Sequence, residues 1–161
     1  MNCPALEPPY LRIVMDNSPK DDLFSRSGGE SVRFEFNEAV ARVFDDMLAR
    51  SVPYVEECRQ MILKIATPFC REGSNVYDLG CSTGSLLLML AETFPPSSKL
   101  IGVDNSRPML EKAREKLQAE GLLGRCGLVE ADLESEINLA DASVVIMNYT
   151  LQFVPPSRRA A

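Results

Sequence analysis

The stretch from Asn75 to Phe94 constrains the fold more than any other part of the sequence. A short apolar run, Asn75-Val76-Tyr77-Asp78-Leu79, leads directly into Gly80-Cys81-Ser82-Thr83-Gly84, and an apolar helical segment from Ser85 to Phe94 follows at once. A strand that passes through a glycine turn into a helix is the first half of a βαβ unit. The sequence therefore predicts a parallel sheet rather than a set of hairpins.

The segments after this unit repeat the alternation. Residues Lys99–Val103 form a second predicted strand, and a helix follows from a cap at Ser106 to about Gly121. Two more apolar runs, Gly127–Glu130 and Ser143–Met147, predict a third and a fourth strand. The pattern is typical of a parallel, doubly wound α/β sheet. Sheets of this kind often have more strands, so we expect an incomplete sheet that is truncated after the fourth strand.

The N-terminal third of the chain has a different character. Residues 1–30 are rich in Pro, Ser, Asp and Gly and lack any sustained period, which is typical of a flexible arm. A helix is predicted from a cap at Asn37 to Pro53, and a second over Val55–Phe69. We therefore divide the chain into an arm (1–30), a helical cap (31–72) and an α/β half-domain (73–161). The apolar face of the second helix is expected to carry Cys58, Met61, Ile62 and Ile65.

Composition excludes several classes of function. The 17 Lys and Arg against 23 Asp and Glu give a net charge of −6, which disfavours direct nucleic-acid binding. The chain has no histidine, so a Ser-His or Cys-His nucleophile pair is excluded. Five scattered cysteines without a C-x-x-C spacing predict neither a disulfide framework nor a metal site, and they fit a cytoplasmic location. No apolar run is long enough to predict a membrane span.

The glycine turn at residues 80–84 is open to three interpretations. The spacing G-x-S-x-G matches a hydrolase nucleophile elbow around Ser82, but that chemistry needs a histidine. A dinucleotide fingerprint needs glycines at 82 and 85, where the chain has Ser82 and Ser85. The third interpretation is a nucleoside joined to an amino acid, with Gly80 allowing close approach and the turn amides and the next helix N-terminus meeting the carboxylate.

Polar residues follow three of the predicted strands and favour the third interpretation. Asp104 lies 24 residues after Gly80, close to the interval at which an acid reaches ribose hydroxyls. Asp132 is placed to accept from the adenine amino group, with the Leu133 amide donating to the ring, and Asn148 completes the row. Each has a simpler alternative, since Asp104 is equally suited to capping a helix and Asp132 is an ordinary loop acid. The coincidence of three strand ends favours a nucleoside site.

Longer motifs carry a family resemblance. Residues 78–84 together with Gly102-Val103-Asp104-Asn105-Ser106 resemble the class I S-adenosyl-L-methionine (SAM)-dependent methyltransferases, which have a Rossmann-like fold. The segments 36–47, Arg50-Ser51-Val52-Pro53-Tyr54 and Asn148-Tyr149-Thr150-Leu151-Gln152-Phe153 are more specific, and they resemble the carboxy-SAM synthase family. The similarity runs from about residue 22 to residue 158. That family usually has a glycine between the residues that correspond to Pro53 and Tyr54.

The resemblance implies an enzyme that converts SAM and prephenate into carboxy-SAM and phenylpyruvate, for use by a partner enzyme on the tRNA wobble uridine. It implies homodimers and a small-molecule substrate. An ordinary SAM-dependent methyltransferase remains an alternative, as does a non-catalytic binding remnant. By matching position, the resemblance places ligand contacts at Tyr54, Gly80, Cys81, Ser82, Asp104, Asn105, Asp132, Leu133 and Asn148.

Overall fold

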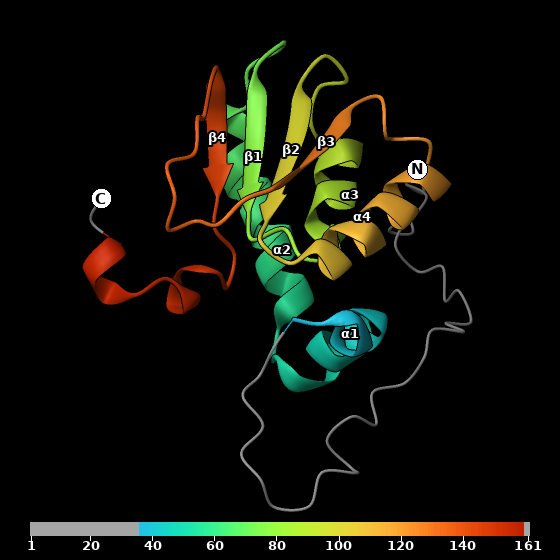
Figure 1. Ribbon diagram of the computed structural model, residues 1–161. Helices are drawn as coiled ribbons and strands as arrows, with labels where there is room; N and C mark the ends of the chain where they lie inside the picture. The colour runs from blue at the N-terminus through green and yellow to red at the C-terminus, as the bar shows by residue number, and fades with distance from the viewer. Residues whose placement is uncertain (1–35, 160–161) are drawn as a thin grey trace, which may run out of the picture.

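A computed structural model describes residues 36–159 and shows one parallel sheet flanked by helices (Figure 1). The predicted arm at residues 1–30 lies outside this range, as do the first five residues of the predicted cap. Within the described residues the sheet has four strands in the order β3-β2-β1-β4, and every neighbouring pair is parallel. The strands are β1 (Asn75–Leu79), β2 (Lys99–Asp104), β3 (Cys126–Glu130) and β4 (Ala142–Ile146).

The strand order explains where a site can form. From β1 the chain moves through β2 to β3 on one side, and it then returns to place β4 on the other side of β1. This reversal between β1 and β4 is the switch point of a doubly wound sheet, where loops at the carboxyl ends of the strands diverge. The predicted parallel α/β sheet is confirmed, with strand limits that differ from prediction by a single residue at most.

The helices begin where local sequence predicts them. The Asn37 side chain accepts from the Val40 amide at 3.1 Å and starts α1 (Glu38–Ser51). The Ser106 hydroxyl accepts from the Met109 amide and starts α4 (Arg107–Ala119). The remaining helices are α3 (Ser85–Thr93) and α2 (Val55–Ala66), and α2 continues into a short 3-10 turn over Thr67–Phe69.

The predicted apolar face of α2 is correct for Ile62, which packs against the core, and for Cys58, which is half-buried, but it is wrong for Met61 and Ile65. The helix buries Leu63 and Ala66 against the core, whereas Met61 is 54% exposed and Ile65 is 62% exposed. The reason is that α2 packs beside α3 with a face rotated away from the predicted one. Ile65 instead borders a groove beside the edge of β4 that no other strand of the described residues pairs with.

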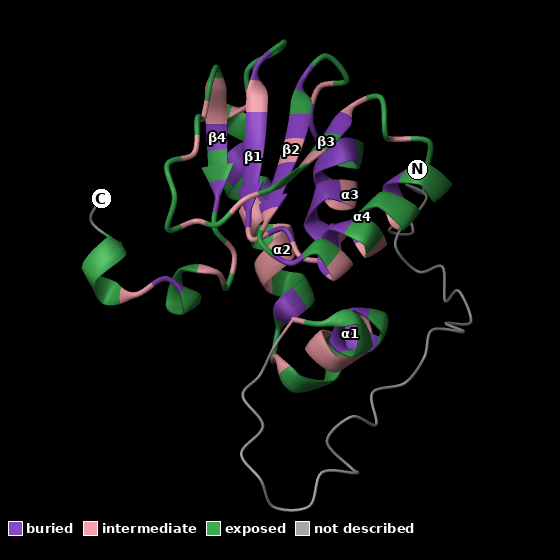
Figure 2. Cartoon of the chain, viewed as in Figure 1, coloured by how far each residue is buried: buried purple, intermediate pink, exposed green. Residues whose placement is uncertain are grey.

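The two faces of the sheet are covered differently. Helices α2, α3 and α4 pack on one face, where Leu87, Leu90, Leu100 and Leu117 are fully buried. The other face, which carries Tyr77, is covered by the connection between β3 and β4. Figure 2 shows that the buried residues concentrate on the central strands and on α3. This core holds the carboxyl ends of all four strands on a rigid base.

Helix α1 lies beyond those carboxyl ends (Figure 1). Its residues Val40, Ala41 and Phe44 pack against Met109 of α4, which is fully buried. The Ser106 hydroxyl donates to the Phe36 carbonyl at 2.6 Å and fixes the start of the helix. Together, these contacts place one wall of apolar side chains opposite the strand ends.

Candidate functional site

A cavity of about 390 Å³ lies between the strand ends and α1. This volume lies within the range of small-molecule sites in proteins. Its lining combines apolar side chains of α1, such as Phe44, with the turns that follow all four strands. Eight of the nine residues predicted to contact a ligand line this one cavity: Gly80, Cys81, Ser82, Asp104, Asn105, Asp132, Leu133 and Asn148.

The backbone of the glycine turn is held by β2. The Gly80 and Cys81 amides donate to the Val103 carbonyl at 2.7 and 3.0 Å, and the Ser82 amide donates to Asp104 Oδ2 at 2.9 Å. All three amides are therefore used within the protein. The expectation that the turn amides meet a ligand carboxylate is wrong for these three residues. No side chain caps the first turn of α3, so its N-terminus still faces the site with a positive end.

Gly80 is required by packing at the cavity floor. Its φ is +79°, in the left-handed region that favours glycine. A Cβ added here would lie 2.3 Å from Thr150 Oγ1, which is far inside van der Waals contact. The close approach joins the turn after β1 to the segment after β4, and so closes the floor of the cavity.

The Asp104 carboxylate accepts hydrogen bonds from two turns. Its Oδ2 accepts from Ser82 and its Oδ1 accepts from the Ser106 amide at 2.9 Å. Burial raises the pKa of the Asp104 carboxyl, and the backbone hydrogen bonds oppose part of that effect. The helix cap itself is Ser106, so capping does not account for Asp104. Because each carboxylate oxygen has a further lone pair, Asp104 can still accept from two vicinal hydroxyls.

Asp78 is an acid at the site that the sequence analysis did not select. Its side chain is 2% exposed, and it borders the cavity beneath Gly80. Burial, followed by the nearby Asp104 charge, raises its pKa to about 7, while Arg59 opposes the rise. Burial also raises the pKa of the Cys81 thiol, which disfavours the nucleophilic thiolate form.

The acids after β2 and β3 mark one end of the cavity. Asp132 Oδ1 accepts from the Glu134 amide at 2.9 Å, which orients the carboxylate and leaves its other oxygen available. Leu133 packs partly against the sheet face that carries Tyr77. Asn148 lies on the opposite side, beyond β4. The predicted row of polar strand-end residues is thus present around one cavity.

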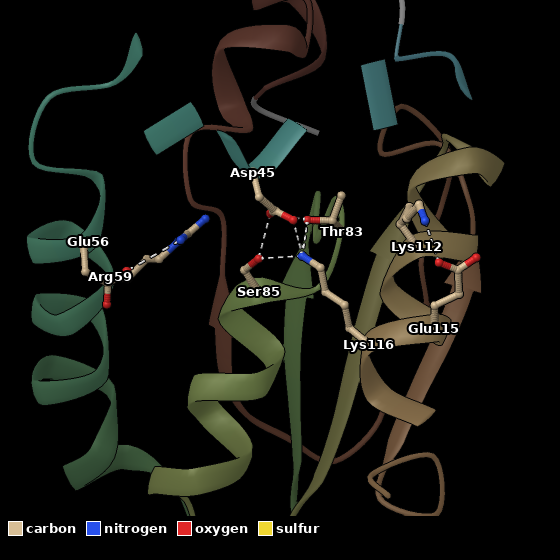
Figure 3. A network of polar contacts seen from close by, with 8 residues as sticks. All are labelled: Asp45, Glu56, Arg59, Thr83, Ser85, Lys112, Glu115 and Lys116. Atoms are coloured by element: carbon tan, nitrogen blue, oxygen red, sulfur yellow. Dashed lines mark hydrogen bonds and ion pairs between the residues drawn. The ribbon is translucent and has the colours of Figure 1, made fainter. Parts of the chain in front are cut away.

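A polar network holds α1 over the cavity (Figure 3). Asp45 of α1 accepts from Thr83 Oγ1 at 2.7 Å and from Ser85 Oγ at 3.0 Å. Lys116 of α4 donates to Asp45 Oδ2 and to both hydroxyls. Burial raises the pKa of the Asp45 carboxyl, but attraction to Lys116 and the three hydrogen bonds outweigh burial and leave it below its ordinary value. The network ties α1, α3 and α4 together.

Tyr54 lies outside the cavity. Its side chain is 75% exposed, and its φ of +57° places it in the left-handed region that glycine favours. The predicted contact at Tyr54 is not among the residues that the structure brings together.

Comparison with known proteins identifies the family and the fold of the chain. Residues 76–161, more than half of the chain, match the methyltransferase domain family. Solved structures of SAM-dependent methyltransferases share the fold. One from Aquifex aeolicus superposes with a TM-score of 0.56 at 22% identity, covering 78% of this chain and 63% of its own. An RNA methyltransferase from Salinibacter ruber, in complex with S-adenosyl-L-homocysteine, gives a TM-score of 0.51 at 24% identity over 60% of each chain.

The chain therefore belongs to the methyltransferase domain family. Its curated relatives include the carboxy-SAM synthases of Methylococcus capsulatus, 40% identical over 141 residues, and of Nitratiruptor sp., 44% identical over 140 residues. Each alignment covers 87% of this chain, but only 58% and 56% of the relative. The chain thus spans little more than half the length of these relatives. Among the described residues, no helix is long and apolar enough to cross a membrane.

Proposed function

We propose that this chain is the SAM-binding part of a carboxy-SAM synthase, and that its cavity takes SAM or carboxy-SAM. The observation that carries the proposal is the convergence of Asp104, Asp132 and Asn148, from three different strand ends, on one cavity beside the glycine turn. Similarity of about 40% to carboxy-SAM synthases over most of the chain supports the particular reaction.

The predicted contact residues that line the cavity have the following tasks in this proposal. Asp104 accepts from the ribose hydroxyls, because its carboxylate is held rigidly by two amides and keeps free lone pairs. Asp132 accepts from the adenine amino group, and the Leu133 amide donates to the ring. The remaining contacts lie along the floor and the β4 side: Gly80, Cys81, Ser82, Asn105 and Asn148. Tyr54 takes no part, because its side chain is exposed outside the cavity.

The protein's contribution to the reaction is positioning and the exclusion of water. When bound, SAM supplies a methyl group that the adjacent sulfonium makes acidic, and prephenate supplies the carboxyl group as carbon dioxide. Phe36, just before α1, packs edge-to-face against Phe153 with ring centroids 5.4 Å apart, so the segments before α1 and after β4 meet at the cavity. We expect this apolar lining to limit the access of water to the reacting carbon.

We also propose a place for the enzyme in tRNA modification, a location and an oligomeric state. Its product would serve a separate enzyme that modifies the tRNA wobble uridine, and the net charge of −6 supports a role without direct nucleic-acid contact. We also propose a cytoplasmic homodimer in which residues 31–72 cap the α/β half-domain of residues 73–161. The polar network between Asp45 of α1 and the α/β residues supports this cap.

The reaction is tested by incubating the chain with SAM and prephenate and analysing the products by mass spectrometry. We expect carboxy-SAM and phenylpyruvate, lost in Asp104→Ala and retained in Arg42→Ala, which changes an exposed arginine of α1. Methylation of an acceptor without carboxy-SAM would favour an ordinary methyltransferase instead. Ligand binding without any turnover would favour the non-catalytic binding remnant.

A further inference from the structure

Arg59 is the single cation among the residues that line the cavity within the described part of the chain. Four acids line the same space: Asp78, Asp104, Asp132 and Glu134. A lone guanidinium in an acidic cavity stands out, because a site for an uncharged nucleoside alone needs no cation. The adenosyl contacts described above leave Arg59 without a task.

The guanidinium is largely buried but poorly paired. The Arg59 side chain is 16% exposed, and its ion pair in the described structure is with Glu56, at 3.6 Å. Glu56 itself is 57% exposed, so water screens that pair. Figure 3 shows the Arg59 side chain extending away from α2. Because a guanidinium carries five N–H donors, most of its hydrogen-bonding capacity is left for a ligand.

The position of Arg59 separates it from the adenosyl end of the cavity. Its charge acts on Asp78, in β1, where it opposes the rise in pKa that burial causes. Asp104 and Asp132 lie after β2 and β3. Strands are about 4.8 Å apart, so the cavity extends roughly 14 Å from β3 to β4. With the nucleoside over β2 and β3, the amino-acid end of the ligand falls near β1 and β4, beside Arg59.

Besides the uncapped N-terminus of α3, a carboxylate at that end can use a side-chain donor. The amides of Gly80, Cys81 and Ser82 already donate to β2 and are not available to it. A planar guanidinium matches the two oxygens of a carboxylate with two parallel hydrogen bonds. A bound carboxylate would also offset the free-energy cost of keeping the Arg59 charge largely buried.

We propose that Arg59 binds a carboxylate of the ligand, a role that rests on the proposed function of the cavity. The carboxylate has two possible sources with the same chemistry. One is the amino-acid carboxylate present in both SAM and carboxy-SAM, and the other is the extra carboxylate that carboxy-SAM alone carries. In either case Arg59 sets the specificity of the cavity for a ligand that carries a carboxylate at this end.

Isothermal titration calorimetry tests the role of Arg59 with three ligands: SAM, carboxy-SAM and 5′-methylthioadenosine, which has no carboxylate. Arg59→Gln should weaken the binding of a carboxylate ligand by about 10- to 100-fold. It should leave the affinity for 5′-methylthioadenosine unchanged, which also shows that the variant is folded. Equal losses for SAM and carboxy-SAM identify the amino-acid carboxylate, and a loss for carboxy-SAM alone identifies the extra one.

Three further variants make the result decisive. Arg59→Lys should keep part of the affinity, since it retains the charge but not the planar fork. Arg42→Gln removes an exposed arginine and should change nothing. Glu56→Gln should leave the binding of carboxylate ligands equal or stronger, because it frees the guanidinium.

Two results overturn the role of Arg59. One is unchanged binding of both carboxylate ligands by Arg59→Gln, while 5′-methylthioadenosine still binds. The other is a loss in Glu56→Gln as large as in Arg59→Gln, which would make the ion pair merely structural. A wild-type chain that binds none of the three ligands overturns the proposed function itself, so the two failures are distinguishable.

Discussion

Replacing Asp78 by asparagine should stabilise the ligand-free protein, and the gain should grow with pH. The Asp78 carboxyl is 2% exposed, and burial and the Asp104 charge raise its pKa from 3.8 to about 7. The folded protein therefore holds a proton that the unfolded chain releases above pH 4. As pH rises toward 7 the folded state loses stability relative to the unfolded state, and the uncharged side chain of the Asp78→Asn variant carries no such cost.

The magnitude follows from the difference between the two pKa values. Each pKa unit corresponds to about 1.4 kcal/mol, so the full difference of roughly 3 units is worth about 4 kcal/mol. Part of this cost is already present at pH 5, where the unfolded carboxyl is ionised. Between pH 5 and pH 8 the advantage of Asp78→Asn over the wild type should therefore grow by about 2–3 kcal/mol.

Urea denaturation of both proteins at several pH values between 5 and 8 measures this difference. The control is Glu111→Gln, an exposed acid of α4 whose replacement should leave the pH dependence unchanged. A stability difference that is the same at pH 5 and pH 8 would refute the reasoning, because it would mean that Asp78 is ionised in the folded state throughout this range.

Three other predictions concern the packing around the site. Asp45→Ala should lower the free energy of unfolding, measured in urea, by about 1–2 kcal/mol, and adding Lys116→Ala should lower it little further. If the losses of the two single variants add fully in the double variant, the two residues are not coupled. Gly80→Ala should cost about 2 kcal/mol or more in the same assay, while Gly124→Ala, which meets open space, should stay within about 0.5 kcal/mol. Tyr54→Gly should raise the unfolding free energy by about 0.5–1 kcal/mol, and equal stabilisation by Tyr54→Ala would contradict the left-handed backbone as its cause.

Local sequence signals predicted the framework of the sheet and of the cavity. The strand, turn and helix at residues 75–93 were predictable from the spacing of hydrophobic residues and from the glycines of the turn. Both signals act over only a few residues. The caps Asn37 and Ser106 were likewise visible, because a capping side chain bonds an amide three residues away. Since parallel strands all end at one edge, the polar residues that follow them had to meet there.

Contacts between distant segments were not predictable in the same way. The prediction for the apolar face of α2 was wrong at Met61 and Ile65, because hydrophobic period indicates that a face is apolar but not which neighbour covers it. The pairing of Asp45 with Lys116 joins residues far apart in sequence, as does the approach of Gly80 to Thr150. In the sequence, Arg59 cannot be distinguished from an ordinary charge on a helix surface, because only the fold places it beside the cavity.

A crystal structure of the chain with bound S-adenosyl-L-homocysteine tests the central claim most directly. The account predicts both ribose hydroxyls within hydrogen-bonding distance of the Asp104 carboxylate, with the adenine ring beside Asp132 and Leu133. A ligand seated away from these strand ends, or one whose ribose turns away from Asp104, would contradict it.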